Sequence, residues 1–126
     1  MNADRFDITV LTYDYLETLL WSSYVGEACD ESADAYEPAL GLIVSSREDV
    51  KDFLAAAGDL IDVAGKVVAG YNAASAMHDF ALTRNGHGAG FWDRGLGAIG
   101  EELTAIAKGF GSHEVYLGDD NLIHEI

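Results

Sequence analysis

The apolar pattern of residues 46–61 constrains the fold of this chain more than any other stretch of its sequence. The apolar side chains recur at spacings of three and four residues: Val50, Phe53, Leu54, Ala57 and Ile61. The charged side chains of the same stretch fall outside that face: Glu48, Lys51, Asp52 and Asp59. Ser46, followed three residues later by Asp49, is similar to the capping box that begins many helices. The pattern predicts an amphipathic helix that begins at Ser46 and buries Phe53.

Two further stretches show the same helical period. Residues 11–24 and residues 96–110 each carry apolar side chains at spacings of three and four residues. Glycines lie at or just beyond the end of both stretches, where they permit a helix to stop. Residues 62–77 are small and apolar and contain Gly65 and Gly70, so they predict a loose helical or irregular connection.

The period changes in the second half of the chain. Residues 79–84 alternate larger and smaller side chains, and the Asn-Gly pair that follows is a strong signal for a two-residue hairpin turn. Residues 89–93 then predict the returning strand, with Arg84 and Asp93 facing each other across it. Residues 113–117 and 122–126 predict a second hairpin around the GDDN turn.

Together these elements predict an α+β fold in a single domain, residues 1–126. Residues 1–77 would form a mainly helical, acidic half. Residues 78–126 would form a β-β-α-β-β unit whose small antiparallel sheet packs against the N-terminal helices.

Net charge is the strongest compositional feature. The chain has 22 acidic and 7 basic residues, a net charge of −15, and no Lys or Arg lies between Arg5 and Arg47. Such a surface repels nucleic acid and attracts basic partners. Dense carboxylates can also imitate the phosphates of DNA, although acidity often serves solubility alone. The candidate binding residues are the acids of this region: Asp14, Glu17, Glu27, Asp30, Glu31, Asp34 and Glu37. Residues 26–38 predict an exposed acidic loop.

Several classes of site lack their patterns. No apolar run is long enough to span a bilayer, and the acidic N-terminus does not resemble a secretion signal. The single cysteine, Cys29, has acidic neighbours that disfavour a thiolate. His87 and Asp93, even with His78 and Asp79, match no metal-ligand spacing. We therefore expect no metal, no cofactor and no membrane partner.

The stretch TRNGHGAGFWDRG, residues 83–95, allows two interpretations. Its glycines suit a tight turn, and its Phe-Trp pair supplies apolar area. Arg84, His87 and Asp93 could instead form the loop site of a small hydrolytic enzyme, because a carboxylate can orient an imidazole for acid-base catalysis. A histidine between glycines suits recognition better than preorganised catalysis.

The run HDFALTRNGHGAGFWDRGLG, with EELTAIAKGFG and VYLGDDNLI after it and LLWSS and DFLAAAGDLID before it, resembles a family of small acidic proteins of bacteriophages and mobile elements. The resemblance covers most of the chain. Ala81 stands where members of that family often carry a large aromatic residue. The family has no settled catalytic motif, so the resemblance implies a phage origin and the host cytoplasm rather than a reaction.

The leading hypothesis is a non-enzymatic phage inhibitor of a host defence protein that handles nucleic acid, such as a CRISPR effector or a restriction-type nuclease. Its partner would be a basic nucleic-acid-binding protein, and the chain itself would not bind nucleic acid. The alternatives are the small hydrolytic enzyme and a phage accessory protein without mimicry. A homodimer is left open.

Overall fold

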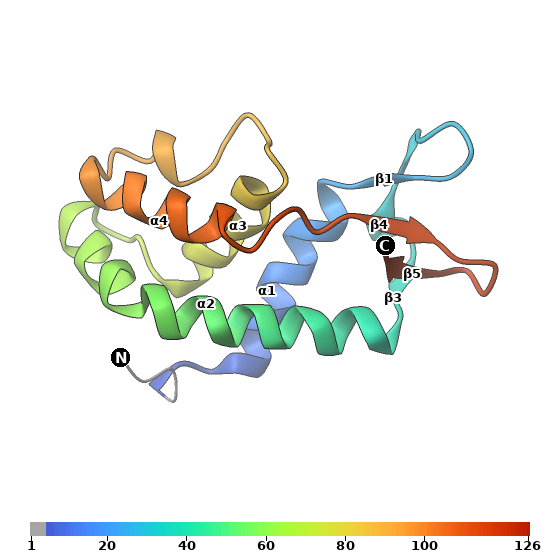
Figure 1. Ribbon diagram of the computed structural model, residues 1–126, viewed down its shortest axis with the longest axis horizontal. Coiled ribbons are helices and arrows are strands. Elements are labelled where there is room, and N and C mark those ends of the chain that lie inside the picture. The colour runs from blue at the N-terminus through green and yellow to red at the C-terminus, as the bar shows by residue number, and fades with distance from the viewer. Residues whose placement is uncertain (1–4) are drawn as a thin grey trace.

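The computed structural model describes residues 5–126, which form four α-helices and two small sheets (Figure 1). The elements follow in the order α1 (Ile8–Trp21), β1 (Tyr24–Val25), β2 (Glu31–Ser32), a 3₁₀ helix (Ala33–Ala35), β3 (Glu37–Pro38), α2 (Leu40–Val67), α3 (Ala73–Arg84), a second 3₁₀ helix (Phe91–Asp93), α4 (Ala98–Lys108), β4 (Val115–Leu117) and β5 (Leu122–Glu125). The strands gather at one end of the molecule, and α3 and α4 lie at the other. The α+β class is confirmed.

Aromatic rings form the centre of the core. Phe53 of α2 stacks on Phe80 of α3 with ring centroids 4.1 Å apart, and Tyr15 of α1 lies 5.2 Å from Phe80. Phe91 lies 5.9 Å from Phe53 on another side. One cluster of buried apolar residues extends from Leu11 to Ile123 and draws on both halves of the chain. The buried position predicted for Phe53 is confirmed.

Helix α2 is longer than its predicted range at both ends. It begins at Leu40, directly after β3 and Pro38, and continues to Val67. Ser46 is therefore not a cap: it is fully buried within the helix, and its hydroxyl has no hydrogen-bond partner. The prediction that the helix begins at Ser46 is wrong because the buried face already includes Leu42, one helical turn earlier. The helices predicted over 11–24 and 96–110 exist as α1 and α4, but α1 begins earlier and ends at Trp21, with Tyr24 in β1, and α4 is shorter at both ends.

The strand predicted over residues 79–84 is wrong, because this stretch is the second half of α3. Asn72 begins the helix with a reciprocal cap: its side chain accepts from the backbone N–H of Ser75, and its own N–H donates to the Ser75 hydroxyl. The helix is buried on nearly all sides: Ala76, Met77, Asp79, Phe80, Ala81, Leu82, Thr83 and Arg84. A helix without a solvent-facing side shows no amphipathic period, so its alternation of large and small residues imitated a strand.

The Asn-Gly pair ends α3 instead of turning a hairpin. Gly86 has a φ of 71°, in the left-handed region that glycine adopts readily. The N–H of Gly86 donates to the carbonyl of Thr83, and the N–H of His87 donates to the carbonyl of Leu82. This pair of bonds is the Schellman motif that ends many helices at a glycine.

The returning strand predicted over residues 89–93 is also wrong, because residues 91–93 form a 3₁₀ helix. Asp93 accepts a hydrogen bond from the N–H of Gly90 at 3.1 Å and so closes this turn. A Cβ atom on Gly90 would collide with the Trp92 ring and the Thr83 hydroxyl. Glycine is therefore required here by close packing against α3 rather than by the ends of a strand.

The two sheets are small and separate. β1 and β2 form an antiparallel pair, and the other sheet has the order β3-β5-β4. β4 pairs antiparallel with β5, which confirms the hairpin predicted over 113–126, but β3 pairs parallel with β5. The predicted antiparallel β-β-α-β-β sheet is thus replaced by a mixed sheet, whose third strand comes from the acidic half of the chain.

Candidate protein-binding groove

The acidic segment before α2 is an ordered hairpin rather than a loop. β1 and β2 pair antiparallel, and the connection between them turns where Gly26 and Cys29 adopt φ angles of 93° and 50°. The N–H of Cys29 donates to the carbonyl of Gly26 at 3.1 Å. The turn leaves Glu27 and Asp30 exposed at the tip of the hairpin.

The β4–β5 hairpin carries a second acidic turn. Asn121 has a φ of 61°, and its N–H donates to the carbonyl of Gly118. Asp120 lies 3.0 Å from the Nε2 atom of His124 and accepts a hydrogen bond from the N–H of Leu122. The hydrogen bond with His124 and then that with Leu122 lower the pKa of Asp120. The carboxylate at this tip is therefore held in its charged form.

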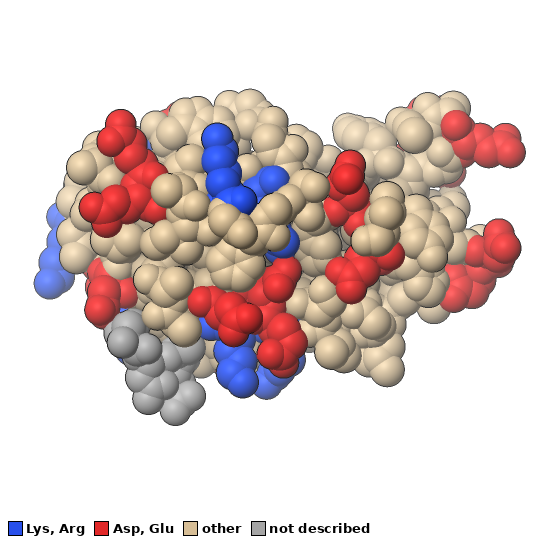
Figure 2. All heavy atoms as spheres, in the orientation of Figure 1, with Lys and Arg blue, Asp and Glu red and all other residues tan. Residues whose placement is uncertain are grey.

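A groove of about 600 Å³ separates the two hairpins. One side runs from Tyr24 through Glu27 to Cys29, and the other runs along β4 to Asp119. Two large aromatic side chains line the groove and are exposed: Tyr24 is 63% exposed and Tyr116 is 47% exposed. Figure 2 shows acidic side chains on both projecting tips at this end of the molecule and a hollowed surface between them.

Neither of the chain segments that border the groove contains Lys or Arg. No Lys or Arg occurs in residues 6–46 or in residues 109–126. Glu27 and Asp119 line the groove, and no basic side chain is among the described residues that do so. Carboxylates without basic neighbours attract a basic partner over long distances, and exposed aromatic rings supply contact area once it arrives. This arrangement suits the binding of a basic protein surface.

The acids predicted from the sequence divide into two groups. Those of the strand-rich segment are all exposed: Glu27, Asp30, Glu31, Asp34 and Glu37. Of these only Glu27 lines the groove, and Asp14 and Glu17 lie on α1. Partial burial, and then the charge of Glu17, raise the pKa of Asp14. The sequence analysis did not identify the acidic turn of the β4–β5 hairpin, although the two aspartates of GDDN were a visible signal. It also did not identify the exposed rings of Tyr24 and Tyr116 that line the groove.

The three residues of the predicted loop site have separate partners. The Arg84 side chain is only 4% exposed and pairs with Asp49 at 2.8 Å. Asp93 accepts from the backbone of Gly90, as described above, and His87 contributes its N–H to the end of α3. Arg84 and Asp93, which were expected to face each other, therefore bind different groups.

Arg84 belongs to a buried polar network that links the helices to the sheet. Its Nη1 atom donates to the Tyr15 hydroxyl at 2.9 Å and to Asp49. The Tyr15 hydroxyl lies 2.7 Å from Nδ1 of His113, whose Nε2 lies 3.0 Å from a carboxylate oxygen of Glu125. Arg84 Nη1 donates to the Tyr15 hydroxyl and lies 3.5 Å from Nδ1 of His113, which favours Nδ1 as an acceptor. With a neutral His113, Tyr15 donates to Nδ1 and Nε2–H donates to Glu125, so that each group has a partner.

The environment of the network agrees with that protonation state. Burial, and then the charge of Arg84, lower the pKa of His113. Burial raises the pKa of Tyr15 above its usual range. The hydrogen bond from Ser45 is the main cause that lowers the pKa of Glu125. The folded protein therefore holds Tyr15 and His113 neutral and Glu125 charged near neutral pH.

The lowered pKa of His113 makes stability depend on pH. Only the unfolded chain takes up this proton just below the usual histidine pKa of 6.5, so stability is complete above that pH and falls as the pH drops toward the folded pKa. Each pH unit in that window costs at most about 1.4 kcal/mol. We expect wild type to lose more unfolding free energy between about pH 7 and about pH 5.5 than His113→Asn does, measured by urea unfolding. Equal losses in both proteins would contradict this assignment.

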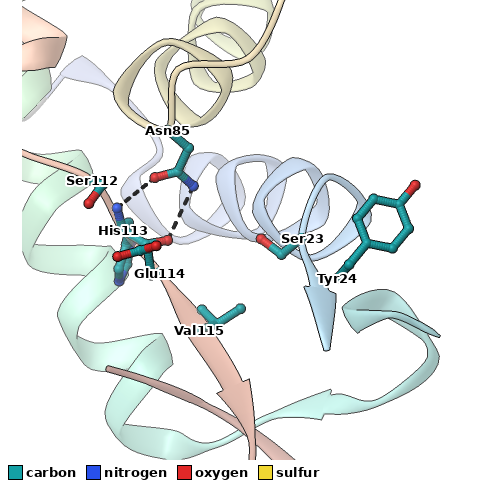
Figure 3. A pocket seen from close by; sticks show the side chains of 7 residues that line it. All are labelled: Ser23, Tyr24, Asn85, Ser112, His113, Glu114 and Val115. Carbon is teal, nitrogen blue, oxygen red and sulfur yellow. Dashed lines mark hydrogen bonds between the residues drawn. The ribbon is translucent and has the colours of Figure 1, made fainter. Parts of the chain in front are cut away.

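A side-chain amide holds the start of β4 against the helical core (Figure 3). Asn85 donates to the carbonyl of His113 at 3.2 Å and accepts from its N–H at 2.6 Å. A hollow of about 220 Å³ lies beside this contact, with Ser23 and Tyr24 on its other side. The contact fixes the position of β4, and hence of one side of the groove.

A buried carboxylate lies between α3 and the segment after the second 3₁₀ helix. Asp79 is 1% exposed. Its carboxylate accepts two hydrogen bonds from Arg94 and one from the Tyr71 hydroxyl. The hydrogen bond with Asp79 raises the pKa of Arg94. Arg94 is thus committed to a structural ion pair, which explains the conspicuous arginine near the end of TRNGHGAGFWDRG.

Within residues 5–126, no group of three or more His, Cys, Asp or Glu side chains is placed to hold a metal ion. No described helix is both long enough and apolar enough to cross a membrane. Comparisons of the chain with protein-family models, with curated proteins and with solved structures find no match.

Proposed function

We propose that this chain is a phage-encoded, non-enzymatic inhibitor of a host defence protein that handles nucleic acid, of the CRISPR-effector or restriction-nuclease type. The observation that carries the proposal is the groove between two acid-tipped hairpins, which lies in a chain of net charge −15. The carboxylates would occupy the surface with which the target binds DNA phosphates.

Charge attraction and apolar contact would make different contributions to binding. Exposed carboxylates on the hairpin tips raise the rate of association with a basic protein, and this effect weakens as salt is added. The exposed rings of Tyr24 and Tyr116 supply the aromatic contacts that dominate binding energy at many interfaces. Both are needed because exposed charge pairs alone contribute only about 0.2–1 kcal/mol each.

The accessibility of the predicted loop site favours inhibition over hydrolysis. A catalytic arginine has to contact its substrate, whereas the Arg84 side chain is 4% exposed and already paired with Asp49. The resemblance of the TRNGHGAGFWDRG region to phage proteins supports action in the host cytoplasm. In this region Arg84 and Arg94 form structural ion pairs and Asn85 positions β4, so that the groove itself would bind the target.

The proposal is tested with two variants of equal charge. The groove variant is Glu27→Gln, Asp30→Asn and Asp119→Asn, and the control is Glu48→Gln, Asp52→Asn and Glu102→Gln on exposed helical positions. We expect immobilised wild type and control to retain a basic nucleic-acid-binding protein from a bacterial lysate, and the groove variant to bind it about tenfold more weakly at low salt, because three exposed contacts are lost.

The captured protein is then purified and assayed for duplex DNA binding. Wild-type chain should displace the DNA, and the groove variant should do so only at higher concentration. The proposal fails if both triple variants retain the same proteins equally well, or if DNA binding by the captured protein is unchanged. Retention of no basic protein would favour an accessory role without mimicry.

A further inference from the structure

We propose that the outer edge of β4 binds an extended, basic segment of the partner as an additional strand. This inference rests on the proposed function, because it specifies which part of a basic partner enters the groove. It predicts main-chain hydrogen bonds in addition to charge attraction.

The pairing register leaves one edge of β4 without partners. The N–H of Ile126 donates to the carbonyl of Glu114, and the N–H of Gly118 donates to the carbonyl of Leu122. Hydrogen-bonded and non-hydrogen-bonded pairs alternate along an antiparallel ladder. The N–H and C=O groups of Tyr116, which pairs with His124, therefore also point toward β5. The N–H and C=O groups of the residues between them therefore point away from β5. No hydrogen bond to those groups occurs within the described residues.

The two residues concerned are Val115 and Leu117. β1 lies beside β4 on this side, but it pairs with β2 and not with β4. The smaller hollow shown in Figure 3 and the groove both reach Tyr24 and Val115, and from there the groove continues along Leu117 to Asp119. The edge is therefore open to solvent around Leu117.

The sequence of this edge lacks the usual protection against pairing. Natural edge strands commonly carry lysine, proline or a bulge, which keep other chains from adding to the sheet. β4 has the sequence VYL and none of these features. An unprotected edge inside an acidic groove fits strand addition, a common mode of peptide recognition in which main-chain bonds give affinity and side chains give specificity.

Charge complementarity specifies the occupant. Glu27 and Asp119 line the groove, and Glu114 precedes β4. A strand places successive side chains on opposite faces, so a segment with alternating basic and apolar residues would direct its apolar side chains to one face and its cations to the other. Such a segment would contact both the apolar side chains of the groove, such as Tyr24 and Tyr116, and its carboxylates, Glu27 and Asp119.

The probe is a capped synthetic peptide of alternating lysine and valine, with a twin that is N-methylated at every second amide. The two peptides carry the same charge, but the twin cannot pair along one edge. We expect the unmodified peptide to bind wild type about tenfold more tightly than the twin, because at least one or two main-chain hydrogen bonds are lost. The amide proton of Leu117, at the open part of the edge, should become protected from hydrogen exchange when it binds.

A matched pair of protein variants tests the same edge. Leu117→Pro removes the outward N–H, whereas Leu117→Val retains it, and neither touches a ladder bond because the Leu117 N–H faces away from β5. We expect about tenfold weaker peptide binding for the proline variant and little change for the valine variant. The methylated peptide gives an independent result on wild type should the proline variant unfold.

The outcomes separate this inference from the proposed function. Equal, salt-sensitive binding of both peptides, or no binding of either at about 1 mM, would overturn strand addition and leave inhibition through acidic groups standing. Preferential binding of the unmodified peptide that is equally tight to wild type and to the groove variant of Glu27, Asp30 and Asp119 would instead support pairing at the edge and contradict the electrostatic account.

Discussion

Replacement of Arg84 by methionine is expected to destabilise the fold by about 3–5 kcal/mol, because it leaves a half-buried carboxylate and several polar acceptors without their donor. The guanidinium donates to Asp49, to the Tyr15 hydroxyl and to the carbonyls of Phe110 and Gly111. Methionine fills much of the same volume but satisfies none of these acceptors. The loss would take a large share of a total stability that is typically about 5–15 kcal/mol.

Urea unfolding measures this prediction, with Arg47→Met as the control. Arg47 is exposed and donates to the Thr9 hydroxyl, so its replacement should change stability by no more than about 0.5 kcal/mol. The double variant Arg84→Met with Asp49→Leu should recover part of the loss, because it removes a carboxylate left without its partner. An Arg84→Met protein within about 1 kcal/mol of wild type would show that the network is not stabilising.

The residues of this network could not be identified from the sequence. Tyr15, Asp49, Arg84, His113 and Glu125 are far apart in the chain, and each has an ordinary local setting. Their association depends on how three helices and a hairpin pack, which no local pattern records. The sequence singles out Arg84 alone among these residues, and its pattern predicts an arm of a hairpin or a loop site for it.

Local patterns were informative where an element has one solvent-facing side. α1, α2, α4 and the β4–β5 hairpin expose such a side, and their stripes or alternation were recognised. α3 is buried nearly all round, so its period was invisible and the Asn-Gly pair was interpreted as a hairpin turn instead of a helix end. The parallel pairing of β3 with β5 joins residues more than eighty positions apart, beyond the reach of any local signal.

The candidate groove was predictable only on one side. The long interval without bases between Arg5 and Arg47 indicated an acidic surface, and the β1–β2 hairpin displays it. The opposite side depends on the tertiary position of β4, which Asn85 sets through its two hydrogen bonds to the backbone of His113. The buried polar groups at that end of α3 thus position a surface that is itself exposed.

Phe53→Ala is expected to lower the free energy of unfolding by about 3–5 kcal/mol, because a buried phenylalanine leaves a cavity that its neighbours fill only in part. Phe53 has no exposed surface and stacks on Phe80, with Phe91 and Phe110 also within 6.1 Å between ring centroids. At roughly 3–5 °C per kcal/mol for a domain of this size, the melting temperature should fall by about 10–20 °C. Leu40→Ala is the control, since Leu40 lies on the same helix but is 74% exposed, and it should melt close to wild type. If Phe53→Ala melted within a degree or two of wild type, the stacked rings would not be the centre of the core.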